Sequence, residues 1–245
     1  PAKDTVPYEK LPELDKYMLH RMTEVFDEVK GAFESYQLFQ FFQTVQNFCV
    51  VDLSNFYLDI GKDRLYISSA DSARRRSCQT VLAVAIENLA KAIAPVLSHM
   101  AEDIWQSLPY DTSAESVFES GWVTLEDGWK QPALAENWQQ LRSLRDEANT
   151  VLEQARSDKS IGSSLQAKLR LHVSDETLKA QLAAMNPADS MSTESNQVDE
   201  LRYLFLVSQV EIVDSTAVLE GTKYSAETDG VTIAVVDAEG KKCDR

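Results

Sequence analysis

The segment LDKYMLHRMTEVFDEVKGAFESY, residues 14–36, decides the fold class of this chain. Its large apolar side chains recur at steps of three and four residues: Leu14, Met18, Met22, Val25, Phe26, Val29 and Phe33. This spacing places them on one stripe of an α-helix. Gly31 weakens the pattern locally. The segment therefore predicts a long amphipathic helix with one apolar face.

More helices are predicted downstream. Residues 37–57 carry a wide apolar stripe, so we expect a central helix covered on several sides. A third helix is expected to start after a cap at Asp71 or Ser72 and to kink or break at Pro95. A covering loop follows, and residues 137–155 form the last helix of the series.

The hydrophobic period changes from helical to alternating near residue 160. Residues 165–173 alternate apolar with polar side chains, which predicts a half-buried strand. A short helix is expected at 177–185, a loop at 186–196, and strands at 204–207, 210–213, 224–226 and 231–236. We therefore expect a mostly α fold: a helical bundle over 1–160, followed by a small mixed α/β module over 161–245.

Composition narrows the functional class. The 245 residues include 24 basic and 39 acidic ones, a net charge of −15, which argues against a general nucleic-acid coat protein. No apolar run approaches the roughly 18 residues of a membrane span, and no secretory signal is visible. Three widely spaced cysteines, Cys49, Cys78 and Cys243, fit a reducing compartment, so we expect a cytoplasmic protein. The first residue is not Met, so we expect a processed chain or a piece of a longer one.

One basic segment stands out in this acidic chain. Residues 62–76 hold five basic and two acidic residues, an excess of three positive charges, and we call the five cations the basic island: Lys62, Arg64, Arg74, Arg75 and Arg76. A solvated helix end explains such a run without any function. However, three arginines at a helix start oppose the helix dipole, which favours an anionic partner.

Aromatic residues accompany the basic island. Phe56, Tyr57 and Tyr66 flank Lys62 and Arg64. Interleaved aromatic and basic side chains suit unpaired RNA bases, through stacking and phosphate pairing. For Phe56 and Tyr57, a place in the core is the better expectation.

No catalytic constellation is apparent. His99, Glu102 and Asp103 lie at helical spacing, but a polar helix end explains them better than a metal site, since no second histidine cluster supports a metal. The phosphate-binding Gly-rich loop, the Gly-x-Ser-x-Gly motif and the His-Glu-x-x-His motif do not occur in the sequence. The sequence therefore predicts no catalytic residue and no cofactor for this chain.

Several stretches resemble the isoleucyl-tRNA synthetases, a class I aminoacyl-tRNA synthetase family. LDKYMLHR (14–21) resembles the first helix of their anticodon-binding bundle, while DLSNFYLD (52–59) and KDRLY (62–66) resemble its second helix and turn. IAPVLSHMAEDIW (93–105) is shared with the valyl and leucyl enzymes, and KSIGSSL (159–165) is more particular to the isoleucyl ones.

The resemblance implies a role in tRNA binding. The family's HIGH and KMSKS signatures are absent, so the chain resembles the C-terminal portion of an enzyme whose ATP- and Mg-dependent core is not included. It would bind the anticodon stem-loop of tRNA(Ile) through the basic island and present the tRNA to that core. The motif match supports Lys62 and Arg64, and charge alone supports the three arginines. We expect a monomer without membrane contact.

The resemblance also bears on zinc. KCDR (242–245) resembles the start of the family's C-terminal zinc module, with Cys243 as a possible first ligand. A structural zinc site needs four ligands, so we expect no complete metal site in this chain.

Two alternatives stay open at this stage. The chain could be the equivalent portion of a valyl or leucyl enzyme. It could also be a helical module that docks proteins and binds no RNA.

Overall fold

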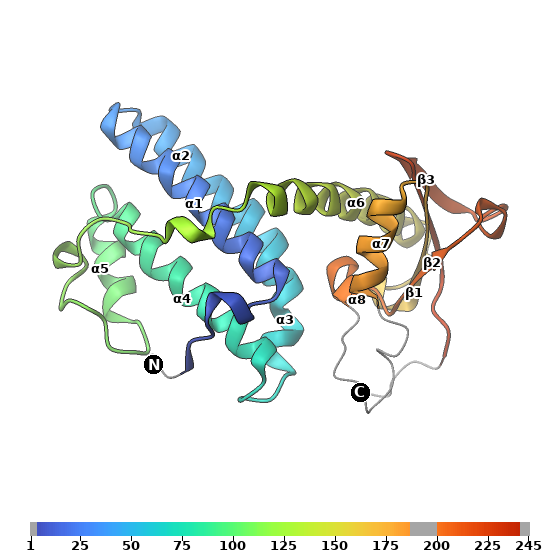
Figure 1. Ribbon diagram of the computed structural model, residues 1–245, viewed down its shortest axis with the longest axis horizontal. Helices are drawn as coiled ribbons and strands as arrows, with labels where there is room; N and C mark the ends of the chain where they lie inside the picture. Colours follow the sequence, from blue (N-terminus) through green and yellow to red (C-terminus); the bar gives the residue numbers. More distant parts are fainter. Residues whose placement is uncertain (1–3, 187–199, 241–245) are drawn as a thin grey trace. The chain divides into compact units, whose positions relative to one another are not determined.

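The computed structural model describes residues 4–186 and 200–240, which fall into two compact units divided after Trp138 (Figure 1). The first unit is helical, and the second combines a four-stranded sheet with helices. The expected mostly α fold with a small mixed α/β part is therefore confirmed. The domain boundary expected near residue 160 stays a prediction.

The first unit is a bundle built on one helical hairpin. Helix α1 lies against the continuous helical segment formed by α2, η3 and α3, which runs back along it; α4 packs on this pair, and α5 packs on α4 (Figure 1). The elements are α1 (Glu13–Glu34), α2 (Leu38–Asn47), η3 (Phe48–Leu58), α3 (Asp59–Tyr66), α4 (Ala73–Ile93) and α5 (Ser98–Gln106). Segment η3 is π-helical, with backbone bonds to the carbonyl five residues back. The break between α4 and α5 surrounds Pro95, as expected.

The burial expected for residues 14–36 and 37–57 is confirmed for one segment and only partly for the other. The stripe of α1 is buried as predicted, with Met18, Met22 and Val25 fully inside. The expectation that residues 37–57 are covered on several sides is wrong for α2, where Phe39 and Phe42 lie exposed. It holds for η3, in which five residues are buried. An isolated wide stripe does not reveal which of its sides has a partner.

A long loop leads from the bundle into helix α6 (Pro132–Ser157), which continues from the first unit into the second. This helix begins five residues earlier than predicted. Pro132 is its first residue, a position where a fixed φ and a missing N–H carry no penalty. Trp138 on α6 stacks on Tyr17 of α1 with ring centroids 5.5 Å apart, which anchors the start of α6 in the bundle.

The second unit is a mixed sheet in the order β2-β1-β4-β3. Strand β1 pairs in parallel with β2 and antiparallel with β4, and β3 is antiparallel to β4. The bounds are β1 (Ala167–Val173), β2 (Gln209–Val213), β3 (Tyr224–Thr228) and β4 (Val231–Asp237), with helices α7 (Glu176–Met185) and α8 (Glu200–Phe205). Short 3-10 turns occur at Tyr8–Lys10, Val117–Glu119, Asp127–Trp129, Ser164–Gln166 and Thr216–Val218.

One predicted strand of this unit is wrong. Residues 204–207 were expected to extend, but Leu204 and Phe205 end helix α8. Leu201, Leu204 and Phe205 are all buried, and their spacing of three and four is that of a helix face. The expected loop at 186–196 lies outside the described residues apart from Asn186.

Two long helices end in a left-handed residue that is not glycine. Tyr36 has φ 55° after α1, and Lys159 has φ 59° after α6. The Tyr36 N–H donates to the Phe33 carbonyl at 3.1 Å, and the next N–H donates to the Ala32 carbonyl at 2.7 Å. This is the Schellman pattern of helix termination, in which the left-handed position favours glycine. Both helices therefore end at a residue whose backbone is strained by the presence of a side chain.

We expect Tyr36→Gly to stabilise the protein, because glycine adopts the left-handed conformation without a steric penalty. Tyr36 is 88% exposed, so little packing is lost. The gain should be roughly 1 kcal/mol in the free energy of unfolding. Urea unfolding followed by circular dichroism measures it. Tyr36→Ala is the control, since it keeps the Cβ and should give no such gain; equal gains from both variants would contradict the backbone explanation.

Candidate nucleic-acid interface

The basic island is divided between two helices, with two of its cations on α3 and three on the first turn of α4. Helix α4 begins after Ser72, one of the two expected cap residues, although its hydroxyl makes no capping bond. The structure gives the five cations of the island very different surroundings.

Arg64 lies in the interior and is 3% exposed. Its guanidinium donates hydrogen bonds to the Asp15 carboxylate from both Nη atoms, and the Nη1 bond is 2.8 Å long. The Tyr57 hydroxyl donates to the same carboxylate at 2.7 Å, and Arg64 also donates to the backbone carbonyl of Arg74. We call Asp15, Tyr57 and Arg64 the buried cluster. The expectation that Arg64 contacts RNA is corrected: its hydrogen bonds are directed at α1 and α4, inside the protein.

The contacts within the buried cluster raise the pKa values of two of its members, Arg64 and Tyr57. Desolvation acts to lower the pKa of Arg64, but the hydrogen bonds and charge of Asp15 outweigh it and raise that pKa above its ordinary value. Burial, together with the charge of Asp15, raises the pKa of Tyr57 well above its usual range. The charged guanidinium of Arg64 and the neutral phenol of Tyr57 are thus the forms that the fold favours.

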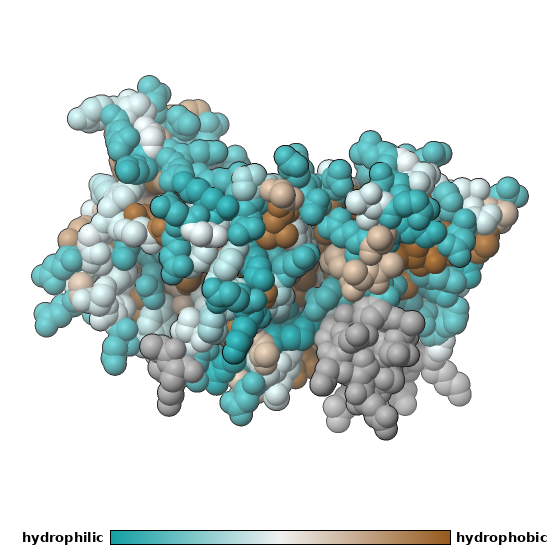
Figure 2. All heavy atoms as spheres, in the orientation of Figure 1, coloured by the Kyte–Doolittle hydropathy of each residue, from teal (hydrophilic) through white to brown (hydrophobic). Residues whose placement is uncertain are grey.

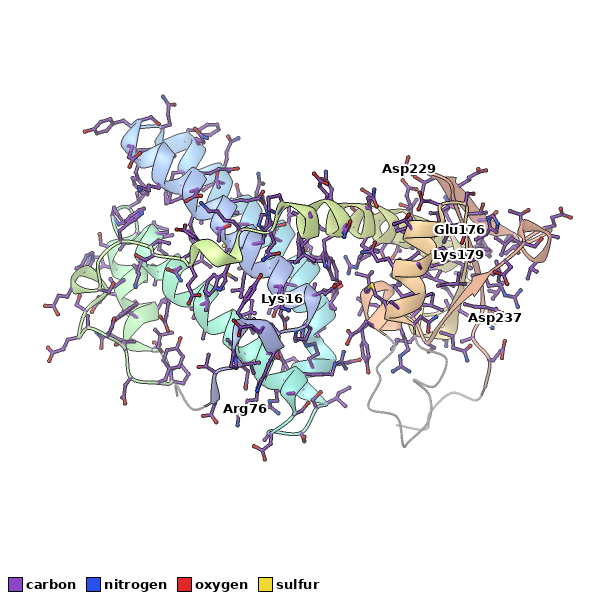
Figure 3. All side chains as sticks on the ribbon, in the orientation of Figure 1. Lys16, Arg76, Glu176, Lys179, Asp229 and Asp237 are labelled. Atoms are coloured by element: carbon purple, nitrogen blue, oxygen red, sulfur yellow. The ribbon has the colours of Figure 1, made fainter. Side chains whose placement is uncertain are left out.

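The other cations of the basic island are accessible. Lys62 is exposed, and its Nζ lies 2.6 Å from an Asp59 carboxylate oxygen one turn earlier on α3. Arg76, labelled in Figure 3, lies 3.6 Å from Asp71 and 3.9 Å from Asp4. Pairs this exposed contribute about 0–1 kcal/mol each, so an anionic ligand can replace them at little cost.

Arg74 and Arg75 are half-buried on the first turn of α4. Arg74 makes a further interaction besides the hydrogen bonds that its carbonyl accepts from Arg64. Arg75 donates to the carbonyl of Ser68 at 3.3 Å and forms no ion pair with any residue that the structure describes. Arg75 is therefore the cation of the island with the least compensated charge.

The aromatic residues near the basic island divide as expected. Phe56 and Tyr57 are buried in the bundle, whereas Tyr66 is 82% exposed at the end of α3.

On the face drawn in Figure 2, hydrophilic side chains cover most of the surface and apolar ones form small separate groups.

The polar helix end at 99–103 has a structural explanation. The Glu102 carboxylate accepts hydrogen bonds from the Ser116 hydroxyl at 2.9 Å and the Val117 N–H at 3.0 Å, which fastens the following loop to α5. The side-chain hydrogen bond from Gln106 is the main reason that the pKa of Glu102 is lowered. Across 4–186 and 200–240 there is no group of three metal-ligating side chains. Cys243, the possible zinc ligand, lies outside the described residues.

Sequence reasoning missed the acidic half of the buried cluster. Asp15 interrupts the start of the α1 stripe, and Asp52 does the same in η3, where it accepts a hydrogen bond from Arg21 at 3.2 Å. A carboxylate inside an apolar pattern is the available signal, because buried charges need a partner. The signal does not identify that partner.

In the described part of the chain, no helix has the length and apolarity to cross a membrane.

Comparisons with known proteins show the family to which this chain is similar. The family described as the anticodon-binding domain of tRNA ligase matches residues 15–171. The chain is 68%, 63% and 61% identical, over all 245 residues, to isoleucine–tRNA ligases of Synechococcus sp., Crocosphaera subtropica and Microcystis aeruginosa. It spans 25–26% of the length of these relatives. The resemblance to isoleucyl-tRNA synthetases is therefore confirmed.

We expect Asp15→Ala to destabilise the first unit severely, because it leaves the Arg64 charge buried without its partner. Breaking a buried pair in this way costs about 3–5 kcal/mol in the free energy of unfolding. Lys62→Ala, which removes an exposed pair, is the control and should cost less than about 1 kcal/mol. Denaturant titration measures both, and similar small losses would contradict a buried charge at Arg64.

The raised pKa of Tyr57 predicts a loss of stability in alkaline solution. The unfolded phenol releases its proton near pH 10, while the folded one retains it. The folded state then binds more protons, so stability is complete below about pH 10 and falls as pH rises further. Tyr57→Phe should show a smaller fall than the wild type between neutral pH and pH 11, measured by thermal unfolding. Identical slopes would show that Tyr57 titrates normally.

Proposed function

The chain belongs to the family of anticodon-binding domains of tRNA ligases, and from this premise we propose that it holds the anticodon stem-loop of tRNA(Ile). The relatives that support this assignment are isoleucine–tRNA ligases about four times as long. In the proposal, the chain is one part of such an enzyme.

The proposed contribution to catalysis is positional. The longer enzyme would join isoleucine to tRNA in a core that uses ATP and Mg²⁺, and the present chain would fix the tRNA so that its acceptor end reaches that core. Holding a reactant in place lowers a barrier by removing translational and rotational freedom before the reaction. The chain itself would act as a monomeric binding part without a catalytic residue.

The observation that carries the proposal is the accessible part of the basic island. This part comprises Lys62, Arg75 and Arg76, which lie on the consecutive helices α3 and α4. The whole chain has a net charge of −15. Lys62 pairs with the half-buried Asp59 and Arg76 with the exposed Asp71, while Arg75 donates to a neutral carbonyl. Phosphate groups compete well for such cations, because RNA offers many negative charges at once. Elsewhere the acidic surface repels RNA, which limits binding to this region.

We expect tRNA binding to weaken as salt rises, and Arg75→Ala to weaken it most among the single substitutions of Arg74, Arg75 and Arg76. Each lost phosphate contact should flatten the plot of log affinity against log salt by about 0.7–0.9. Fluorescence anisotropy of labelled tRNA(Ile) at several salt concentrations measures affinity and slope together.

The matched control for this titration is Lys30→Ala. Lys30 is exposed on α1 and lies 4.0 Å from Glu34, so the variant removes one positive charge from the same unit at another place. It should leave the salt slope unchanged. If the triple variant of Arg74, Arg75 and Arg76 behaves like Lys30→Ala, the basic island does not bind RNA.

A protein-docking module without RNA binding is the second candidate. Exposed apolar side chains gather at the α1–α2 hairpin, at Tyr36, Leu38, Phe39 and Phe42. Exposed apolar patches are typical of protein contacts. Failure of the wild type to bind tRNA in low salt would favour this candidate.

A further inference from the structure

The turn between α3 and α4 presents two large apolar side chains to solvent. Tyr66 is 82% exposed and Ile67 is 76% exposed. They are neighbours at the end of a helix, where an amphipathic pattern would normally turn such residues inward.

This turn is braced from both sides. The N–H groups of Ile67 and Ser68 donate to the Asp63 carbonyl at 3.0 and 3.2 Å, which ends α3. Arg75 reaches back from α4 to the Ser68 carbonyl, and the buried guanidinium of Arg64 bonds to the first turn of α4. The backbone that carries the exposed pair is therefore fixed before any ligand arrives, which lowers the entropy lost on binding.

Positive charge surrounds the pair. Lys62 lies four residues before Tyr66 on α3, a spacing that places both side chains on one helix face. Arg75 is tied to the same turn. The other strongly exposed tyrosine, Tyr36, follows a helix whose last turns carry Glu28 and Glu34 against one cation, Lys30, so the local charge is negative. The two tyrosines therefore share exposure and differ in the charge beside them.

We propose that Tyr66 and Ile67 form a stacking surface for an unpaired RNA base, with Lys62 and Arg75 holding the flanking phosphates. The proposal rests on the proposed function and names the part of the RNA that this site takes. A base within a duplex has both faces covered by neighbouring pairs, so the site selects a loop nucleotide over a paired one. Stacking on an aromatic ring tolerates every base, so the site recognises single-stranded character and not sequence.

The test uses two labelled RNA probes. One is a hairpin with the tRNA(Ile) anticodon stem and its open loop, and the other is a fully paired duplex with the same number of nucleotides. Wild-type protein should bind the hairpin more tightly than the duplex. Tyr66→Ala should weaken hairpin binding about tenfold and leave duplex binding unchanged. Tyr66→Phe should retain the preference, because it keeps the ring.

Tyr36→Ala is the matched control, since it removes an equally exposed ring from an acidic site, and it should change neither affinity. Loop probes with 2-aminopurine add a direct readout: binding should quench its fluorescence with the wild type and not with Tyr66→Ala. Unfolding curves of each variant confirm that it folds.

The outcomes separate this inference from the proposed function. Hairpin binding that does not depend on Tyr66, or an equal loss for hairpin and duplex, overturns the stacking surface and leaves tRNA binding standing. Failure of the wild type to bind either probe in low salt overturns both.

Discussion

The first unit depends on one buried ion pair. Asp15 near the start of α1 and Arg64 on α3 are separated by 49 residues and bond through both ends of the guanidinium. Tyr57 shares the carboxylate, and the carbonyl of Arg74 accepts hydrogen bonds from Nε and Nη2 of Arg64. Three helices, α1, α3 and α4, thus meet at one charge pair. Because neither charge can be buried alone, the pair fixes which faces of these helices come together.

The same pair shapes the surface above it. With Arg64 bonded inward and Arg75 bonded to Ser68, the turn after α3 has a fixed course and leaves Tyr66 in solvent. The cations that remain accessible pair with carboxylates that solvent reaches, and phosphate can replace these partners. A strongly acidic chain can therefore offer one cationic, aromatic surface to RNA while its other surfaces repel it.

Much of the fold follows from local patterns. The α1 stripe, the break at Pro95 and the alternation along β1 each reflect a single period or a single residue type, and these predictions are confirmed. One error falls where a short segment supports two periods. Residues 204–207 read as a strand in isolation, and only the packing of Leu204 and Phe205 against their neighbours makes them the end of a helix.

The sequence by itself determined that this chain is a helical bundle with a small α/β part, that it resembles the tRNA-binding portion of a synthetase, and that its positive charge gathers at 62–76. Charge and hydrophobic periodicity are properties of the sequence of residues, so they can be determined without a structure. Only the tertiary structure decided which of these cations face solvent. Lys62 and Arg64 lie two residues apart in one motif, yet the helix turns them by about 200° relative to each other. Arg64 thereby meets Asp15 in the core, and Lys62 is left for a partner outside.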